Sequence, residues 1–256
     1  MQTLTGIVFA GAAALAAWRV RAVTARGALA AWIVGACIFG AGSWAYAAVL
    51  FTFFIPSVLL SRIGRARKRT LQDTGKAGPR DAWQVLANGG VAALLAVLAA
   101  ATRNPALAAA FAGALAAASS DTWGTEIGTI VKAKPRSILT LRPVSTGISG
   151  GITLAGTLAE AAGAMAVSLV AWRLHVGSWW IVAAAGFAGA LVDSVLGATL
   201  QELRYCPQCR RPCETDPHAC GTPTRLVRGA CWMNNDAVNA CCTIAGALAA
   251  LLLSRT

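Results

Sequence analysis

Long apolar stretches alternate with short polar loops along the whole chain. Crossing a bilayer takes about 17 to 25 mostly apolar residues, and eight segments approach that length. They cover residues 3–18, 28–42, 44–61, 83–101, 105–120, 147–172, 178–200 and 233–254. Several are short and rich in Ala and Gly, which favours helices that pack closely on one another. The pattern predicts an all-α, polytopic transmembrane bundle of about eight spans that forms one domain over residues 1–256.

The apolar region 28–61 is too long for one span. As a single helix it would measure about 50 Å, because an α-helix rises about 1.5 Å per residue. The short sequence Gly40-Ala41-Gly42-Ser43 offers a place for the chain to turn. We therefore predict two spans here, joined by a tight hairpin.

Composition and charge agree with a membrane protein. Hydrophobic residues make up 57% of the chain and charged residues 12%, whereas soluble domains carry about 25% charged residues. The loops 19–27, 62–82, 121–146 and 201–232 hold 19 of the 22 Lys and Arg residues. The positive-inside rule places these loops in the cytoplasm and both termini on the other side of the cell inner membrane. The same rule accounts for the net charge of +12, so nucleic acid is not an expected partner.

Acidic residues are rare, and several stand at the predicted cytoplasmic ends of spans. Asp121 ends the fifth span, Asp193 lies in the seventh, and Asp236 begins the eighth. Ionisable groups in spans are costly and usually functional, and Mg²⁺ prefers carboxylate and phosphate oxygens. We predict that these three residues bind a Mg²⁺ that bridges to a polyphosphate. Alternatively, they pair with Arg or cap helix ends, as Asp236 could at the start of its span.

A stripe of small residues accompanies one of these carboxylates. Gly186, Gly189 and Gly197 fall on the same face of the predicted seventh helix as Asp193, since residues three or four apart are neighbours on a helix. Small residues allow close contact between helices. We therefore expect another stretch of backbone to pack next to this carboxylate.

A second set of residues is predicted to contact phosphate groups. The sequence RPVSTGISGG (142–151) enters the predicted sixth span, and the backbone N–H groups at such a helix start bind phosphate well. The predicted binding residues are Asn88, Glu126, Lys132, Lys134, Arg142, Ser145, Thr146, Gly147, Ser149, Gly150, Gln201, Asn235 and Asn239. The cations of this set could instead serve only membrane topology, and the amides could simply join neighbouring helices. The sequence contains no Walker A motif.

The loop 201–232 is rich in Cys and is predicted to form a small cytoplasmic insert between the last two helices. Cys206, Cys209, His218 and Cys220 supply the ligands of a tetrahedral Zn²⁺ site in a reducing cytoplasm. Cys213 is a competing ligand, and a group of free thiols is the alternative. A closed site would be structural, because so small an insert cannot hold a core by itself.

Several motifs occur in an order that resembles a known membrane-protein family. WQVLANGG, SSDTWGTEIG, STGISGG, DSVLGATLQ and NNDAVN follow one another from residue 83 to residue 239. Together they resemble a polytopic family that includes plant phytyl-phosphate kinase, and residues 1–60 match it only in hydropathy. The resemblance implies an enzyme that transfers a phosphoryl group from a nucleoside triphosphate to an isoprenoid (phytyl or prenyl) monophosphate and gives the diphosphate. CTP is the expected donor.

The residues and the resemblance agree on where the chemistry takes place. Phosphoryl transfer needs mainly Mg²⁺, cations and rigid positioning. The same groups would serve a CTP-dependent cytidylyltransferase that makes a CDP-lipid, and the sequence does not separate the two reactions. A transporter would need polar groups through the whole membrane thickness, whereas only Glu160 lies near the middle of a span. The sequence does not indicate an oligomeric state.

Overall fold

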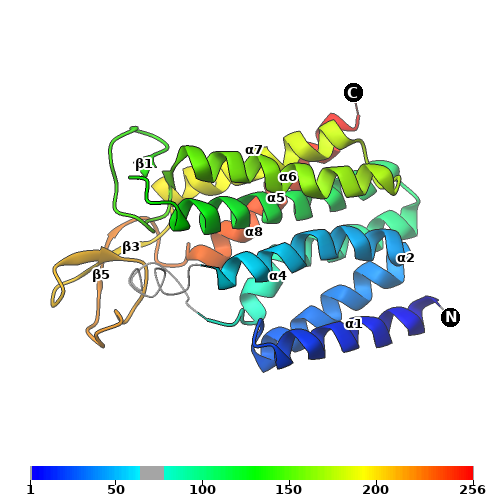
Figure 1. Cartoon of the computed structure of the whole chain (residues 1–256), viewed down its shortest axis with the longest axis horizontal. Coiled ribbons are helices and arrows are strands. Elements are labelled where there is room, and N and C mark those ends of the chain that lie inside the picture. The colour runs from blue at the N-terminus through cyan, green and yellow to red at the C-terminus, as the bar shows by residue number, and fades with distance from the viewer. Residues whose placement is uncertain (1, 64–77, 256) are drawn as a thin grey trace.

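The computed structural model describes residues 2–63 and 78–255, apart from the side chains of Gln2, Thr3 and Ser43. Long helices form a bundle with a small β-sheet insert at one end (Figure 1). The helices are α1 (Gln2–Arg19), α2 (Ala25–Arg62), α4 (Ala82–Thr102), α5 (Pro105–Ile130), α6 (Leu154–Arg173), α7 (Trp179–Thr199) and α8 (Asn235–Leu253). Most of the predicted basic loop 62–82 lies outside the described residues.

Most of these helices can cross a membrane. Six apolar segments in the described residues are long enough: Ala25–Gly42, Trp44–Arg62, Ala82–Thr102, Leu154–Arg173, Trp179–Thr199 and Asn235–Leu253. Helix α1 has a shorter apolar stretch, Leu4–Arg19. Helix α5 stands in the middle of the bundle, and every residue from Ala109 to Ser120 is buried. The predicted polytopic helical fold is confirmed.

The chain reverses direction inside α2. The Arg62 guanidinium at the end of α2 donates a hydrogen bond of 2.6 Å to the backbone carbonyl of Val20, which lies before the helix begins. A straight helix of 38 residues would be about 57 Å long and would keep these residues far apart. At the turn, a side chain on Gly42 would overlap the ring of Tyr46. The two apolar segments of α2 therefore form the predicted hairpin.

Small residues bring α7 into backbone contact with α5. A Cβ atom on Gly186 would lie 2.6 Å from the Cβ of Ala116, and one on Gly189 would lie 2.5 Å from the Cβ of Ala117. Carbon atoms do not approach so closely without displacement, so both positions require glycine. The expected close packing along the stripe of small residues that contains Asp193 is confirmed.

Helix α5 extends beyond the predicted fifth span, which was placed at residues 105–120. It continues to Ile130, so Asp121 and Glu126 lie inside the helix. Ser, Thr and Asp favour turns over helix interiors, but packing against α6 overrides this preference. The Ser120 hydroxyl donates a hydrogen bond of 2.8 Å to the backbone carbonyl of Glu160 in α6.

The predicted start of the sixth span at residue 147 is wrong. Helix α6 begins at Leu154, and Thr153 caps it by accepting a hydrogen bond from the Gly156 N–H. Gly147 and Gly150 have positive φ angles of 90° and 79°, a conformation that an α-helix of L-residues cannot contain. Residues 145–150 therefore form a loop instead of a helix start.

The Cys-rich insert is a β-structure. Its three antiparallel strands are β3 (Leu203–Cys206), β4 (Arg211–Cys213) and β5 (Arg225–Arg228), with β3 in the centre. A second pair, β1 (Arg136–Ser137) and β2 (Gly151–Ile152), fastens the loop between α5 and α6. Figure 1 shows the insert at the opposite end of the bundle from both termini. The all-α prediction therefore holds for the bundle, whereas the short insert, bounded by turn-forming Pro and Gly, folds as a sheet.

We expect Gly189→Val to lower the midpoint of thermal unfolding in detergent by about 2 to 12 °C. Overpacking costs about 1–3 kcal/mol, and about 1 kcal/mol shifts the midpoint of a chain of this size by about 2–4 °C. Gly90→Ala is the control, because a Cβ there would lie 3.9 Å from Leu86, an ordinary contact. Equal midpoints for the two variants would contradict the close packing of α5 and α7.

Candidate functional site

A polar cavity of about 290 Å³ lies at the end of the bundle that carries the insert. Parts of α4, α5, α6, α7 and α8 form its wall, together with the loop before α6 and one residue of the insert. Its polar and charged lining residues are Arg80, Gln84, Asn88, Asp121, Thr122, Thr125, Glu126, Thr129, Thr146, Ser149, Thr153, Thr157, Glu160, Asp193, Ser194, Glu214, Asn235 and Asn239.

Asp121 of α5 and Asp193 of α7 meet in this cavity. Their carboxyl groups are in hydrogen-bond contact, and Thr125 also forms a hydrogen bond with Asp121. The second carboxyl oxygen of Asp193, Oδ2, is buried and has no hydrogen-bond partner among the described residues. Two ionised carboxylates in contact repel each other. The pair therefore requires a proton or a bound cation.

Glu160 of α6 brings a third carboxylate to the same place. Its side chain is buried, its Oε2 has no hydrogen-bond partner among the described residues, and its charge acts on both Asp121 and Asp193. Gly124 makes room for it, because a Cβ there would overlap the Glu160 side chain. Glu160 was predicted to lie near the middle of a span, away from the other carboxylates, whereas it stands in the second turn of α6. A lone acid in an apolar span was nevertheless a signal of function.

Glu214 reaches the cavity from the insert. Its carboxylate accepts hydrogen bonds from the Ser149 N–H at 2.8 Å, from the Ser149 hydroxyl at 3.0 Å and from the Gln201 amide at 3.1 Å. Burial raises the pKa of Glu214, while the bonds from Ser149 and the positive charge of Arg228 oppose the rise. Sequence reasoning missed Glu214, because nothing near it in the chain signals that the insert folds back onto the bundle.

The charges that line the cavity do not balance. Five carboxylates line it, and Arg80 is the only cation among the described lining residues. Burial lowers the pKa of Arg80, and the negative charge of Asp121 opposes this shift. Arg80 is also absent from the predicted binding set, although it stands directly before the fourth span. A cluster of carboxylate oxygens with excess negative charge fits a Mg²⁺ ion that also contacts phosphate.

The structure gathers most of the predicted site residues around the cavity. Those that line it are Asn88, Asp121, Glu126, Thr146, Gly147, Ser149, Gly150, Asp193, Asn235 and Asn239. Gln201 is buried outside the lining and acts on it through Glu214. Lys132, Lys134, Arg142 and Ser145 are exposed and do not line the cavity. These four were predicted to lie close to a helix start, and α6 begins further along the chain.

Asp236, the third predicted Mg²⁺ ligand, is not among the described residues that line the cavity. It lies in the first turn of α8, where the helix dipole favours a carboxylate. Asn234, and not Asp236, caps this helix by accepting a hydrogen bond from the Ala237 N–H. Its neighbours Asn235 and Asn239 do line the cavity. A ligand role for Asp236 stays a prediction.

The predicted zinc ligands lie together in the insert. The ligand atoms of Cys206, Cys209, His218 and Cys220 are all within 4.8 Å of one another. The Sγ atoms of Cys206 and Cys220 are 3.6 Å apart, and a tetrahedral Zn²⁺ with Zn–S bonds of about 2.3 Å needs about 3.8 Å. The donor set and its spacing therefore fit a closed, structural Zn²⁺ site.

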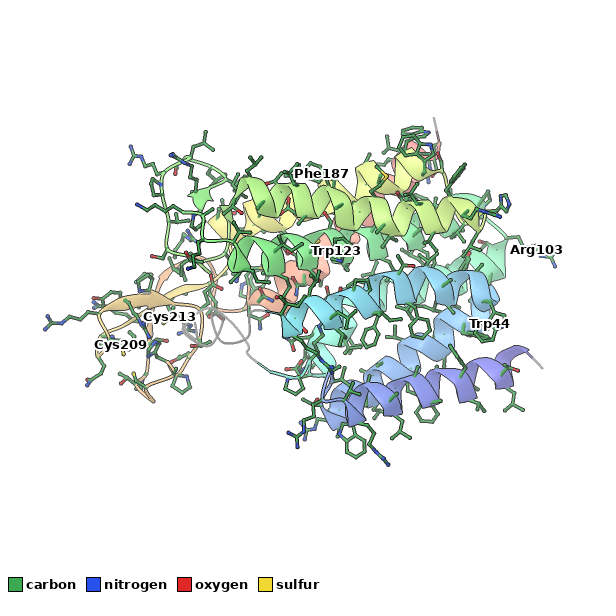
Figure 2. The ribbon with its side chains drawn as sticks, in the orientation of Figure 1. Trp44, Arg103, Trp123, Phe187, Cys209 and Cys213 are labelled. Carbon is green, nitrogen blue, oxygen red and sulfur yellow. The ribbon has the colours of Figure 1, made fainter. Side chains whose placement is uncertain are left out.

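The competing ligand Cys213 lies apart from this cluster. It is buried, and its Sγ atom faces the backbone carbonyl of Thr215. Within the cluster, hydrogen bonds with Thr222 and then with His218 lower the pKa of Cys220 to about 6. A lowered pKa favours the thiolate, the form that binds metal. Figure 2 shows Cys209 and Cys213 at the end of the molecule formed by the insert.

Comparisons with known proteins agree with this architecture. A family model described as "Integral membrane protein DUF92" matches residues 8–247. Protein PGR of Arabidopsis thaliana is 30% identical over 93% of this chain and 91% of its own length. Uncharacterized membrane proteins of Methanocaldococcus jannaschii and Synechocystis are 36% and 29% identical, over 71% and 67% of this chain and 76% and 69% of their own lengths. No solved structure matches.

We expect the purified protein to contain about one zinc ion per chain, because four ligands saturate a tetrahedral site. Mass spectrometry of the metal content measures this. Cys206→Ser should lose the ion, whereas Cys213→Ser and Cys231→Ser should keep it, since neither thiol belongs to the cluster. Zinc retained by Cys206→Ser, or lost from Cys213→Ser, would show that the ligand set is different.

Proposed function

Because the chain belongs to the integral membrane protein family DUF92, we propose that it is an integral-membrane lipid-phosphate kinase. It transfers the terminal phosphoryl group of a nucleoside triphosphate, with CTP as the expected donor, to an isoprenoid monophosphate. The observation that carries this proposal is the cluster of unbalanced carboxylates in one polar cavity at the end of an apolar bundle. A lipid phosphate and a Mg²⁺-bound nucleotide can meet at such a place.

The reaction needs little covalent chemistry from the protein. An oxygen of the lipid monophosphate attacks the γ-phosphorus of the nucleotide. A new P–O bond forms as the bond to the bridging oxygen breaks, and the electron pair leaves with the nucleoside diphosphate. The lipid phosphate is already anionic at neutral pH, so no strong general base is required. A bound Mg²⁺ would neutralise negative charge on the phosphate oxygens.

Some residues of the cavity bind the metal ion, and others bind the phosphate groups. Asp121 and Asp193 hold Mg²⁺, and Glu160 adds negative charge beside them. Arg80 is positively charged, and its guanidinium binds a phosphate oxygen. The amides of Asn235 and Asn239, on one face of α8, orient the phosphates.

The position of the cavity favours catalysis at one membrane face over transport. In each of α4 to α8, the described lining residues belong to the half of the helix nearest the insert. Glu160 lies in the second turn of α6, so it belongs to this end and not to a path across the bundle. A transport path would continue through the membrane, whereas the middle of α5 consists of buried apolar residues, most of them Ala.

We expect purified protein to convert prenyl monophosphates into diphosphates when a nucleoside triphosphate and Mg²⁺ are present, and to stop when EDTA is added. The assay combines CTP or ATP with a panel of prenyl monophosphates, and labelled CTP identifies the products. Nucleoside diphosphate is the expected second product. Pyrophosphate with a CDP-lipid would establish a cytidylyltransferase instead, and flux through liposomes without nucleotide turnover would establish a transporter.

Asp121→Asn and Asp193→Asn should each reduce turnover by a factor on the order of 100 or more, because losing a Mg²⁺ ligand removes several kcal/mol of charge stabilisation. Glu202→Gln is the control, since Glu202 pairs with Arg204 at 2.7 Å and does not line the cavity. Binding also stabilises the folded state. Mg²⁺ should therefore raise the midpoint of thermal unfolding of the wild type but not of Asp193→Asn. A normal response to Mg²⁺ in that variant would remove Asp193 from the metal site.

A further inference from the structure

We propose that the hydrocarbon chain of the lipid substrate lies in an apolar pocket between α1, α2 and α4, with its phosphate in the polar cavity. This inference rests on the proposed function, because it takes the acceptor of the phosphoryl group to be a single-chain lipid phosphate. Its basis is a second cavity of about 80 Å³ in the N-terminal part of the bundle.

Aromatic rings and small aliphatic side chains form the wall of this pocket. The ring centroid of Phe9 in α1 lies 5.6 Å from that of Phe39 and 5.8 Å from that of Phe51, which belong to the two halves of the α2 hairpin. The rest of the wall includes Phe53, Phe54 and Leu50, together with several Ala and Val residues. Such a surface binds hydrocarbon, because contact with it removes apolar area from water or from loosely packed lipid.

The apolar pocket and the polar cavity meet at the start of α4. They share three lining residues, Arg80, Gln84 and Asn88. The backbone of Arg80 is fixed by two hydrogen bonds, from the Thr24 N–H to its carbonyl at 2.9 Å and from its own N–H to the Ala22 carbonyl at 3.0 Å. One cation therefore stands at the boundary between an apolar and a polar space, where the anionic head of a lipid phosphate joins its chain.

The lining residues also give the pocket a direction. On α1 they run from Phe9 to Ala17, about 12 Å along the helix axis. The Ala17 carbonyl accepts a hydrogen bond from the Ala22 N–H, so this end lies beside Arg80. The other end approaches Trp44, whose ring lies 4.9 Å from that of Phe9, and Figure 2 shows Trp44 at the end of the bundle away from the insert. A chain in the pocket thus runs along the helices, away from the polar cavity.

The size and charge of the pocket favour a lipid with one chain and one phosphate group. The cavity measures about 80 Å³, which leaves little room for a second chain, and Arg80, the one cation among its described lining residues, suits one phosphate group. A phospholipid with two chains would have to leave its second chain outside. The occupant is therefore a single-chain lipid phosphate and not a bulk membrane lipid.

Photolabelling tests this directly. The probe is farnesyl monophosphate with a diazirine at the far end of its chain, added to the full-length protein in detergent without nucleotide. We expect the label in peptides of α1 and of the α2 hairpin, near Phe9 and Phe39, and we expect unlabelled farnesyl monophosphate to abolish it. Label on the outward faces of α6 or α7, or label removed by phosphatidylglycerol but not by farnesyl monophosphate, would overturn the proposal.

Matched variants test the pocket independently of the label position. Ala13→Phe and Ala31→Phe place a ring in the pocket from two different helices and should each reduce labelling about tenfold, because they exclude several methylene groups. Ala12→Phe is the control, since Ala12 is exposed on the same helix and does not line the pocket. An unchanged midpoint of thermal unfolding shows that each variant is folded. Undiminished labelling of the two pocket variants would contradict the proposal.

These measurements separate the two proposals. Labelling requires neither nucleotide nor turnover. If the protein is labelled in α1 and α2 but transfers no phosphoryl group, the chain-binding pocket is supported and the kinase proposal is contradicted. If it makes prenyl diphosphate but is labelled elsewhere, the kinase proposal is supported and the pocket is contradicted.

Discussion

Close packing around α5 determines where the helix-borne carboxylates of the cavity lie. A Cβ on Gly246 of α8 would lie 2.7 Å from the backbone oxygen of Gly113, and one on Gly163 of α6 would lie 2.8 Å from that of Ser119. Within lipid there is no hydrophobic force between helices, so close van der Waals contacts and interhelical hydrogen bonds hold the bundle together. Larger side chains at these crossings would move the helices apart, and with them the carboxylates that they carry.

The same packing creates the electrostatic problem at the end of the bundle. Asp121, Glu160 and Asp193 stand on three helices that cannot separate, and two of their oxygens are buried without a partner among the described residues. Unpaired buried carboxylates cost stability, so a structure built only for stability would not collect them. This cost is reasonable for a binding site, since a divalent cation and its phosphate ligand can repay it when they bind.

Hydropathy and charge made most of the architecture predictable, whereas contacts between distant segments were not. The α2 hairpin follows from the length of one apolar region, and the pairing of Asp121 with Asp193 follows from two acids at the same predicted membrane face. The end of α5 could not be predicted, because its polar residues are held in a helix by contacts with α6. Glu214 and Arg80 enter the cavity from segments outside the spans, and no local pattern encodes such a contact.

The insert is more than an attachment at the end of the bundle, because one of its residues lines the cavity. The Arg228 guanidinium at the end of β5 donates a hydrogen bond of 2.8 Å to the backbone carbonyl of Gly197, one turn beyond Asp193 in α7. Glu214 directly follows β4, stands between two of the predicted zinc ligands in sequence, and holds the loop before α6 through Ser149. A metal that orders the insert would therefore also order one wall of the cavity. This connection gives a physical reason for the predicted zinc site to lie in an insert that also forms part of the cavity wall.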